Sequence, residues 1–442
     1  MSLLRALLAV FLLSAGVPSV ASPQATPLLR IQGSNTVGAA LAPALVEGLF
    51  HQQGFSAITR RPGGQENEQT VLARNAEGAW VQIAVAAHGS STGFRALRER
   101  SAELAASSRP VKDAEVNALA ARGDLRSRGS EQVIAIDGLA VIVHPTNPLR
   151  SLDVDQLAAL FSGELRNWRA LGGPDAPVRL YARDDQSGTY DTFKELVLVP
   201  QGQQLDAGAR RFESNDRLSE AVMADPLGIG FVGLASVGQA RALAISAGGA
   251  QALLPSPDSV ATEDYPLSRR LFLYRAPDDA SPWAQALIDY AQSAEGQRIV
   301  ERVGFIGQAV RAIPVEAHAN LPGDYRELAQ TGRRLSINFR FQEGSAQLDN
   351  KAMRDLERVR DYLNASAGAD AQLVLVGFGD AKNDPSRARL LSRLRAETVR
   401  RALSRLGVTN SQVLGIGDDL PVADNQAESG RIRNRRVEVW IR

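Results

Sequence analysis

The sequence predicts two folded regions of different class: a larger α/β region over about residues 28–312 and a smaller α+β region over residues 333–442. In the larger region, three short apolar runs are each followed by a turn rich in glycine, serine or threonine and then by a helical pattern. The smaller region has a β-α-β-α-β pattern. The charge also changes between them, with 20 Lys+Arg and 14 Asp+Glu over residues 331–442 against 30 and 35 before them.

Composition excludes several classes of protein. The 442 residues are too many for one ordinary domain, and a content of 44% apolar residues is enough for packed cores. A net charge of +1 argues against a nucleic-acid-binding protein and against a disordered one. The chain has no cysteine, which excludes disulfides, thiolate metal sites and a lipid-anchored N-terminal cysteine. The four histidines are scattered without metal-ligand spacing, so we expect no metal and no cofactor.

The N-terminus has the pattern of a secretory signal peptide. Arg5 is followed by the apolar run Ala6 to Ala15 and then by small residues, which predicts a signal over residues 1–21 with cleavage after Ala21. This run is too short to cross a membrane, and no later segment is long and apolar enough, so we expect no transmembrane segment in the mature chain. A buried N-terminal helix is the alternative.

In the larger region, three predicted turns lie at the carboxyl ends of predicted strands. The predicted strands are residues 28–32, 81–86 and 178–181, and the predicted helices follow the turns at residues 33–37, 89–93 and 184–188. Turns at the carboxyl ends of strands line the ligand crevice of an open α/β sheet.

The third turn has the composition of an anion site. The start of a helix leaves backbone N–H groups unpaired and carries a partial positive charge, and Ser187, Gly188 and Thr189 lie at this start. Arg183 adds a two-pronged charged donor suited to a tetrahedral oxyanion. The alternative is that Ser187 or Thr189 only caps the helix, because capping uses the same groups.

An enzymatic interpretation rests on the second turn. Gly89-Ser90-Ser91-Thr92-Gly93 matches the GxSxG pattern of a nucleophile elbow with Ser91 as the nucleophile. A hydrolase of that kind needs an acid and then a histidine downstream, and only His144 and His318 follow. We therefore favour a binding or capping turn and expect no catalytic residues.

The larger region resembles the PstS-like family of periplasmic phosphate-binding proteins over nearly all of residues 28–312. The motifs that carry the resemblance are Gly33-Ser34-Asn35-Thr36, Gly89-Ser90-Ser91-Thr92-Gly93, Ala106-Ser107-Ser108-Arg109-Pro110, residues 137–148, residues 157–163, Asn167-Trp168, Arg183 with Ser187-Gly188-Thr189, residues 228–233 and Gly304-Phe305.

This resemblance implies a two-lobed periplasmic binding protein fold (type II-like), with a hinged cleft that closes on a dehydrated phosphate. The matching phosphate ligands are Ser34 or Thr36, Ser90, Ser108, Arg183, Ser187, Gly188 and Thr189. Some family members have an aspartate where Ser107 and Ser108 stand, so here a hydroxyl accepts the phosphate proton or Arg109 adds charge instead. For Arg109, a structural ion pair is the alternative. An ABC transporter permease is the implied partner.

Residues 313–332 are predicted to be a linker, because they combine prolines, a glycine and alternating charge. In the smaller region the predicted strands are residues 335–341, 372–377, 411–416 and 436–441, and the predicted helices are residues 352–365 and 387–406.

The smaller region resembles the OmpA-like peptidoglycan-binding domain over about 110 residues. The motifs are Gly377-Phe378-Gly379-Asp380, Leu391-Ser392-Arg393-Leu394-Arg395-Ala396, Gly415-Ile416-Gly417, and Asn425 with residues 430–438.

By this resemblance Asp380 and Arg395 hold the diaminopimelate of the stem peptide, whose free end carries an ammonium and a carboxylate. Arg435 either supports this site or has a structural role at the start of the final strand. The sequence departs from the family at Gly379, Asn383 and Ala388. A salt bridge between Asp380 and Arg395 is the alternative.

Together the two regions predict an exported, peptidoglycan-associated periplasmic protein that binds phosphate or a related oxyanion, for uptake or sensing, with no nucleic-acid partner. Two other functions stay open. One is a cell-wall-bound scaffold whose cleft is vestigial or takes a different anion, and the other is a serine hydrolase that uses Ser91.

Overall fold

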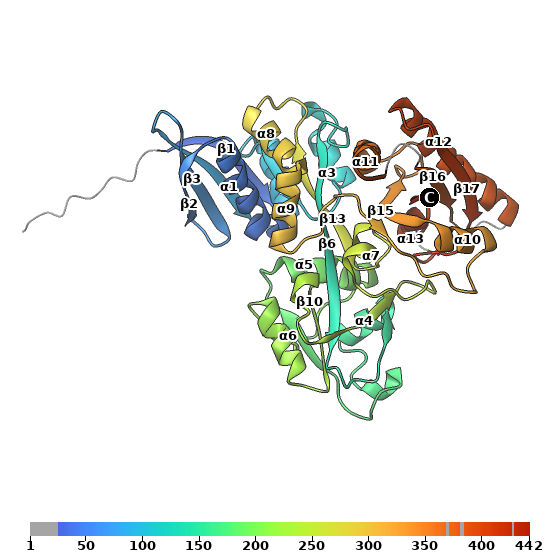
Figure 1. Cartoon of the computed structure of the whole chain (residues 1–442). Helices are drawn as coiled ribbons and strands as arrows, with labels where there is room; N and C mark the ends of the chain where they lie inside the picture. Colours follow the sequence, from blue (N-terminus) through green and yellow to red (C-terminus); the bar gives the residue numbers. More distant parts are fainter. Residues whose placement is uncertain (1–24, 368–370, 381–383, 427) are drawn as a thin grey trace, which may run out of the picture.

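The chain forms two lobes followed by a C-terminal domain (Figure 1), in a computed structural model that describes residues 25–367, 371–380, 384–426 and 428–442. The sheet orders confirm the predicted fold class, a two-lobed α/β region joined to a small α+β domain. The expected signal peptide, residues 1–21, lies outside the described residues. Among the described helices, none combines the length and the apolar character that a membrane crossing requires.

The first lobe is built on a mixed sheet, to which the chain returns with β13 (Ser268–Arg275) after it has formed the second lobe. In spatial order the strands of this sheet are β2 (Ser56–Pro62), β3 (Glu68–Arg74), β4 (Trp80–Ala87), β1 (Thr26–Gly33), β5 (Leu104–Ser107), β13 and the first half of β6 (Glu131–Val143). Its helical segments are η1 (Val37–Leu41), α1 (Ala42–Gln52), α2 (Ser90–Glu99), α3 (Asp113–Ala118), α8 (Pro282–Gln292) and α9 (Ala294–Val303). Leu45, Val46 and Leu49 of α1 share one buried apolar core with Leu29 and Ile31 of β1, as the apolar spacing predicts.

The second turn is shorter than expected. Helix α2 begins at Ser90, so both serines of the Gly89–Gly93 segment lie in its first turn. Gly89 alone makes the reversal, with a φ of 97° that a residue with a side chain rarely adopts.

The second lobe contains β10 (Gly228–Gly233), β8 (Arg179–Arg183), β9 (Arg210–Phe212) and the second half of β6. Its helices are α4 (Val154–Phe161), α5 (Gly188–Phe193), which continues into η4 (Lys194–Leu198), α6 (Asn215–Met223) and α7 (Pro257–Ala261). Aromatic rings dominate the core, where Phe193 stacks on Phe231 with ring centroids 4.0 Å apart and Phe161 packs edge-on against both. The core therefore holds α5 rigidly against β10.

The two lobes are joined by β6, whose 13 residues run through both (Figure 1). Strand β13 pairs with β6 as far as Gly138, and β10 pairs with it from Leu139 onward. β6 thus exchanges its pairing partner next to Asp137 and Gly138, which lie opposite Arg269 and Ser268. These four positions, where the chain passes between the lobes, are where we expect the hinge of the cleft that the resemblance implies.

The C-terminal domain has a five-stranded sheet in the order β14 (Ala312–Ile313), β15 (Arg333–Arg340), β18 (Arg436–Ile441), β16 (Leu373–Phe378) and β17 (Ser411–Gly417). Helices α11 (Asn350–Tyr362) and α12 (Pro385–Arg405) pack on this sheet, and α13 (Glu428–Asn434) precedes β18. All six predicted elements of this region are present, and β18 has the predicted bounds.

The expected linker is more ordered than its composition suggests. Residues 313–332 contain α10 (Gly323–Thr331), which buries Tyr325 and Leu328 against the C-terminal sheet. Tyr325 packs edge-on against Trp440 at 5.3 Å and donates a 2.9 Å hydrogen bond to Glu438 Oε2. This segment therefore belongs structurally to the C-terminal domain.

Candidate functional site

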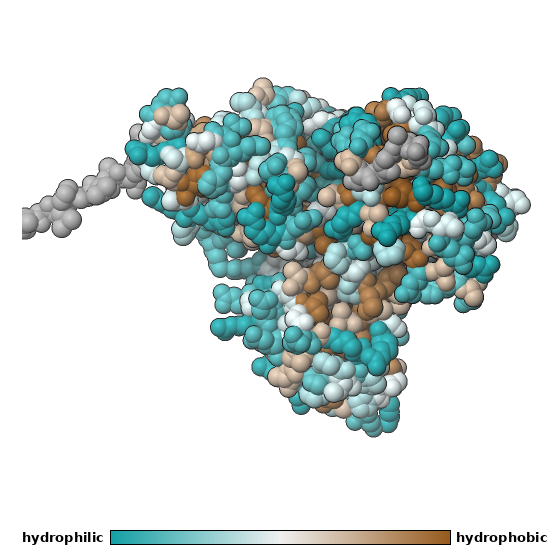
Figure 2. Space-filling view, in the orientation of Figure 1, coloured by the Kyte–Doolittle hydropathy of each residue, from teal (hydrophilic) through white to brown (hydrophobic). Residues whose placement is uncertain are grey.

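A polar cavity of about 260 Å³ lies between the two lobes. Its first-lobe wall is formed by Ser34, His88, Gly89, Ser90, Ser91, Ser108, Arg109 and Lys112, and Asp191 and Glu195 line it from the second lobe. Figure 2 shows a hollow between the two lobes on the left of the molecule.

The hydroxyl-rich wall follows from the strand order. Ser34 and Ser108 come directly after β1 and β5, and Ser90 follows β4 by three residues; these strands are parallel neighbours in the sheet. Their carboxyl ends meet at one edge, so three turns far apart in the sequence converge. Ser90 Oγ lies 3.2 Å from both the backbone N and the Oγ of Ser108. Three of the predicted ligands are thus on one cavity wall.

The third predicted turn touches the first lobe directly. Ser187 Oγ caps α5 by accepting from the N–H groups of Thr189 at 3.2 Å and Tyr190 at 3.4 Å. Thr36 Oγ1 donates to Gly188 O at 3.2 Å, and a methyl group on Gly188 would lie 2.6 Å from Thr36 Cα. The lobes are therefore closed onto each other at this point, beside the cavity.

The described contacts turn Arg183 away from this cavity. Its Nε donates to Phe212 O at 3.1 Å and its Nη2 to Glu213 O at 2.6 Å, and Asp184 lies 3.5 Å away. Burial lowers the pKa of Arg183, and the nearby carboxylate of Asp184 opposes that shift. In this closed arrangement Arg183 connects β8 to the end of β9, and its role as an anion ligand stays a prediction.

Arg269, which bonds the cavity-lining Glu195, is a residue beside this cavity that sequence reasoning missed. Its Nη2 donates to Thr36 Oγ1 at 2.7 Å and Gly188 O at 3.2 Å, and its Nη1 to Glu195 Oε2 at 2.8 Å. Its Nε also lies 3.4 Å from Asp137 Oδ2, and the residue is 8% exposed. Arg269 therefore connects the hinge to both lobes. The available signal was the pair of arginines at positions 269 and 270, directly before the apolar run Leu271 to Tyr274.

The contacts of Arg109 test two alternatives: a structural ion pair of Arg109, and a serine hydrolase that uses Ser91. Glu115 accepts from both terminal nitrogens of Arg109, at 2.7 and 2.9 Å, so the structural ion pair is confirmed. Arg109 Nη2 also donates to Ser91 Oγ at 2.9 Å. A guanidinium cannot act as a general base, and within the described residues no histidine is hydrogen-bonded to Ser91. His88 Nε2 instead lies 3.3 Å from Glu68 Oε1.

The predicted cell-wall ligands lie together in the C-terminal domain. Arg435 Nη2 donates to Asp380 Oδ2 at 2.9 Å, and Arg395 Nη1 lies 3.5 Å from Phe378 O. Burial lowers the pKa of Arg395, Asp380 opposes this shift, and Arg435 adds to it. One carboxylate and two guanidiniums therefore share a small site. Position 383, one of the noted departures, lies outside the described residues.

Comparisons with known proteins agree with this organisation. A family model described as a PBP superfamily domain matches residues 65–295, and one described as the OmpA family matches residues 340–435. The SphX protein of Synechococcus elongatus is 33% identical over 205 residues, which cover 44% of this chain and 59% of that protein. The phosphate-binding protein PstS of Borreliella burgdorferi is 26% identical over 245 residues, covering 54% of this chain and 85% of that protein.

A solved structure shows the same fold. A possible phosphate binding protein from Planctomyces limnophilus superposes with a TM-score of 0.50 at 23% identity, covering 69% of this chain and 96% of that one. The chain spans little more than half the length of SphX but most of PstS. These matches show that the chain belongs to the PBP superfamily and that a domain of the OmpA family follows its two lobes in the sequence.

Proposed function

We propose that this protein captures inorganic phosphate, or a closely related oxyanion, between its lobes and is held at peptidoglycan by its C-terminal domain. The observation that carries the proposal is the convergence of Ser34, Ser90 and Ser108 on one wall of the cavity between the lobes. A buried oxyanion is tolerated only where each oxygen receives donors, and hydroxyls beside strand ends and helix starts supply them. The name of the PstS relative supports phosphate as the anion.

Binding without catalysis is part of this proposal. The described contacts of Ser91 hold its hydroxyl next to a cation rather than a base. We place the mature chain in the periplasm, where captured phosphate is either passed to an ABC transporter permease or sensed locally. Attachment to the cell wall favours local capture, because a tethered receptor diffuses poorly.

Calorimetric titration of the full mature chain with phosphate tests the cleft. We expect saturable binding that Ser90→Ala weakens by about 10- to 100-fold, because a hydrogen bond to a charged group contributes about 1.5–3 kcal/mol. Thr92→Ala is the matched control: it removes a hydroxyl from the same helix that donates to Gly89 O and does not line the cavity. Absence of heat with phosphate, arsenate and sulfate would contradict the proposal, as would equal affinities of the two variants.

Co-sedimentation with purified peptidoglycan tests the C-terminal site. We expect Arg395→Ala to lower the affinity about 10-fold or more, since it removes the charged donor for a carboxylate of the stem peptide. Arg401→Ala removes the same charge from an exposed position of α12 and should bind as the unaltered chain does. If both variants sediment alike, Asp380 and Arg395 form a structural cluster and not a ligand site.

A further inference from the structure

The C-terminal domain contacts both lobes from the side of the hinge away from the cavity. In Figure 1 this domain lies to the right of β6 and β13, whereas α5 lies to their left. Every residue that lines the interlobe cavity belongs to one of the two lobes. The domain is therefore placed to influence movement of the lobes without touching the ligand.

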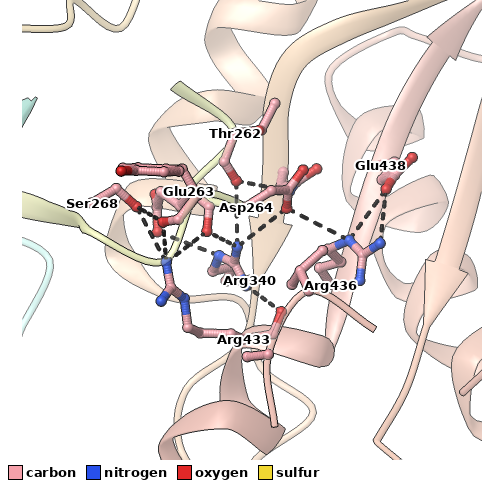
Figure 3. A network of polar contacts seen from close by, with 12 residues as sticks. Thr262, Glu263, Asp264, Ser268, Arg340, Arg433, Arg436 and Glu438 are labelled. Atoms are coloured by element: carbon pink, nitrogen blue, oxygen red, sulfur yellow. Dashed lines mark hydrogen bonds and ion pairs between the residues drawn. The ribbon is translucent and has the colours of Figure 1, made fainter. Parts of the chain in front are cut away.

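Its contact with the second lobe is centred on the segment 262–268, between α7 and β13 (Figure 3). Asn338 Nδ2 donates to Thr262 O and to Asp264 Oδ1, both at 2.8 Å. Arg433 donates to Tyr265 O at 2.6 Å, to Pro266 O at 3.0 Å and to Ser268 Oγ at 3.2 Å. This segment ends at the hinge residue Ser268, so the contact reaches the hinge itself.

Two buried carboxylates strengthen this contact. Asp264 Oδ2 accepts from Arg334 at 2.7 Å, and Arg340 and Arg436 lie 3.8 Å from Asp264 Oδ1. Burial alone would raise the pKa of Asp264, but these three arginines outweigh burial and lower the pKa to about 2. Glu263 behaves in the same way beside Arg270, Lys351 and Arg340. Both carboxylates are thus charged and paired at neutral pH.

The contact with the first lobe is made by α11 and contains buried as well as exposed pairs. Asp349, which caps α11, pairs with Arg270 of β13 at 2.7 Å, and both side chains are 17% exposed. Asn350 Nδ2 donates to Arg126 O at 2.9 Å, and Arg354 Nη2 donates to Gln132 Oε1 at 3.1 Å. Arg128 pairs with Glu357 at 2.7 Å, although these side chains are 52% and 39% exposed. Exposed pairs of this kind hold less strongly than a buried, fully paired network.

We propose that the C-terminal domain is a brace across the hinge that favours the closed arrangement of the lobes and slows release of the bound anion. If the lobes separate, the C-terminal domain cannot keep its contacts with both of them and must lose its contacts with one lobe. Among the α11 contacts, the exposed Arg128–Glu357 pair is the weakest, so it is the first to break. Opening of the cleft is thereby coupled to the loss of the α11 contacts.

Distances between the lobes test the brace without any ligand. The chain has no cysteine, so Glu77→Cys and Glu164→Cys place one spin label on an exposed position of each lobe. In the full chain we expect one narrow distance distribution. Adding Arg354→Ala and Glu357→Ala should broaden it towards longer distances. Arg360→Ala, on the same helix but paired with Asp361, should leave it unchanged. Identical distributions in all three proteins would overturn the brace.

Release kinetics give the second readout, which rests on the proposed phosphate function. We expect the Arg354→Ala, Glu357→Ala chain to release phosphate about 5-fold faster or more, the lower range for coupling between distant sites. Arg360→Ala should release it at the unaltered rate. Equal release rates in a chain that does bind phosphate would count against the brace. If no variant binds phosphate, the functional proposal fails and the distance measurement alone decides the brace.

Discussion

Replacement of Asp264 by asparagine is expected to lower the free energy of unfolding of the full chain by about 3–5 kcal/mol. The carboxylate is 5% exposed and is surrounded by Arg334, Arg340 and Arg436. Asparagine keeps the shape but removes the negative charge, and it turns an NH₂ group towards at least one guanidinium. Three buried cations then lose a shared counter-charge, which is the costly way to disrupt a buried ion pair.

Asp258→Asn is the matched control for this change. Asp258 of α7 pairs with Arg311, the residue before β14, at 3.2 Å, but its side chain is 46% exposed. Water already screens this pair, so its loss should cost less than about 1 kcal/mol. Urea unfolding at pH 7, followed by circular dichroism, compares the two variants. Equal midpoints would show that the Asp264 network does not stabilise the chain.

The wall of the interlobe cavity was predictable from the sequence because its geometry follows from topology. Ser34 and Ser90 each follow an apolar strand run, and strands of one parallel sheet end at a common edge. The same argument extends to Ser108 through β5. Local patterns therefore suffice where a site is made of strand ends.

The contacts that hold the lobes together were not predictable in this way. Arg269 meets Asp137 from 132 positions away and Thr36 from 233 positions away. Nothing near Arg269 in the sequence specifies these partners, since side-chain pairing across a hinge depends on how both lobes fold. The orientation of the Arg183 side chain could not be predicted for the same reason, because it is set by hydrogen bonds to the backbone carbonyls of Phe212 and Glu213 at the end of β9.

Helix α10 shows a different limit. Its proline and glycine neighbours and its charged residues are typical of a linker, and only Tyr325 and Leu328 are buried in it. Two apolar residues three positions apart are too few to establish a helical period. The helix is stabilised by its packing against Trp440 and Glu438, which lie more than a hundred positions further along.

Gly188→Ala is expected to weaken phosphate binding by about 10- to 100-fold, which corresponds to the 1–3 kcal/mol that overpacking typically costs. The added methyl group would lie 2.6 Å from Thr36 Cα and 2.8 Å from Thr36 N. Backbone atoms cannot move aside as a flexible side chain does, so the lobes must separate to relieve the contact. Alanine suits the first position of α5 better than glycine does, so the second lobe itself should fold normally.

Gly129→Ala is the control, because Gly129 has open space around it and no positive φ. Calorimetry should give this variant the affinity of the unaltered chain, and labels on the two lobes should report the same distance. In Gly188→Ala the same labels should move apart while affinity falls. This joint change would identify closure at Thr36 and Gly188 as a requirement for binding. Unchanged affinity with separated lobes would instead mean that the anion is held by the first-lobe wall of Ser34, Ser90 and Ser108 alone.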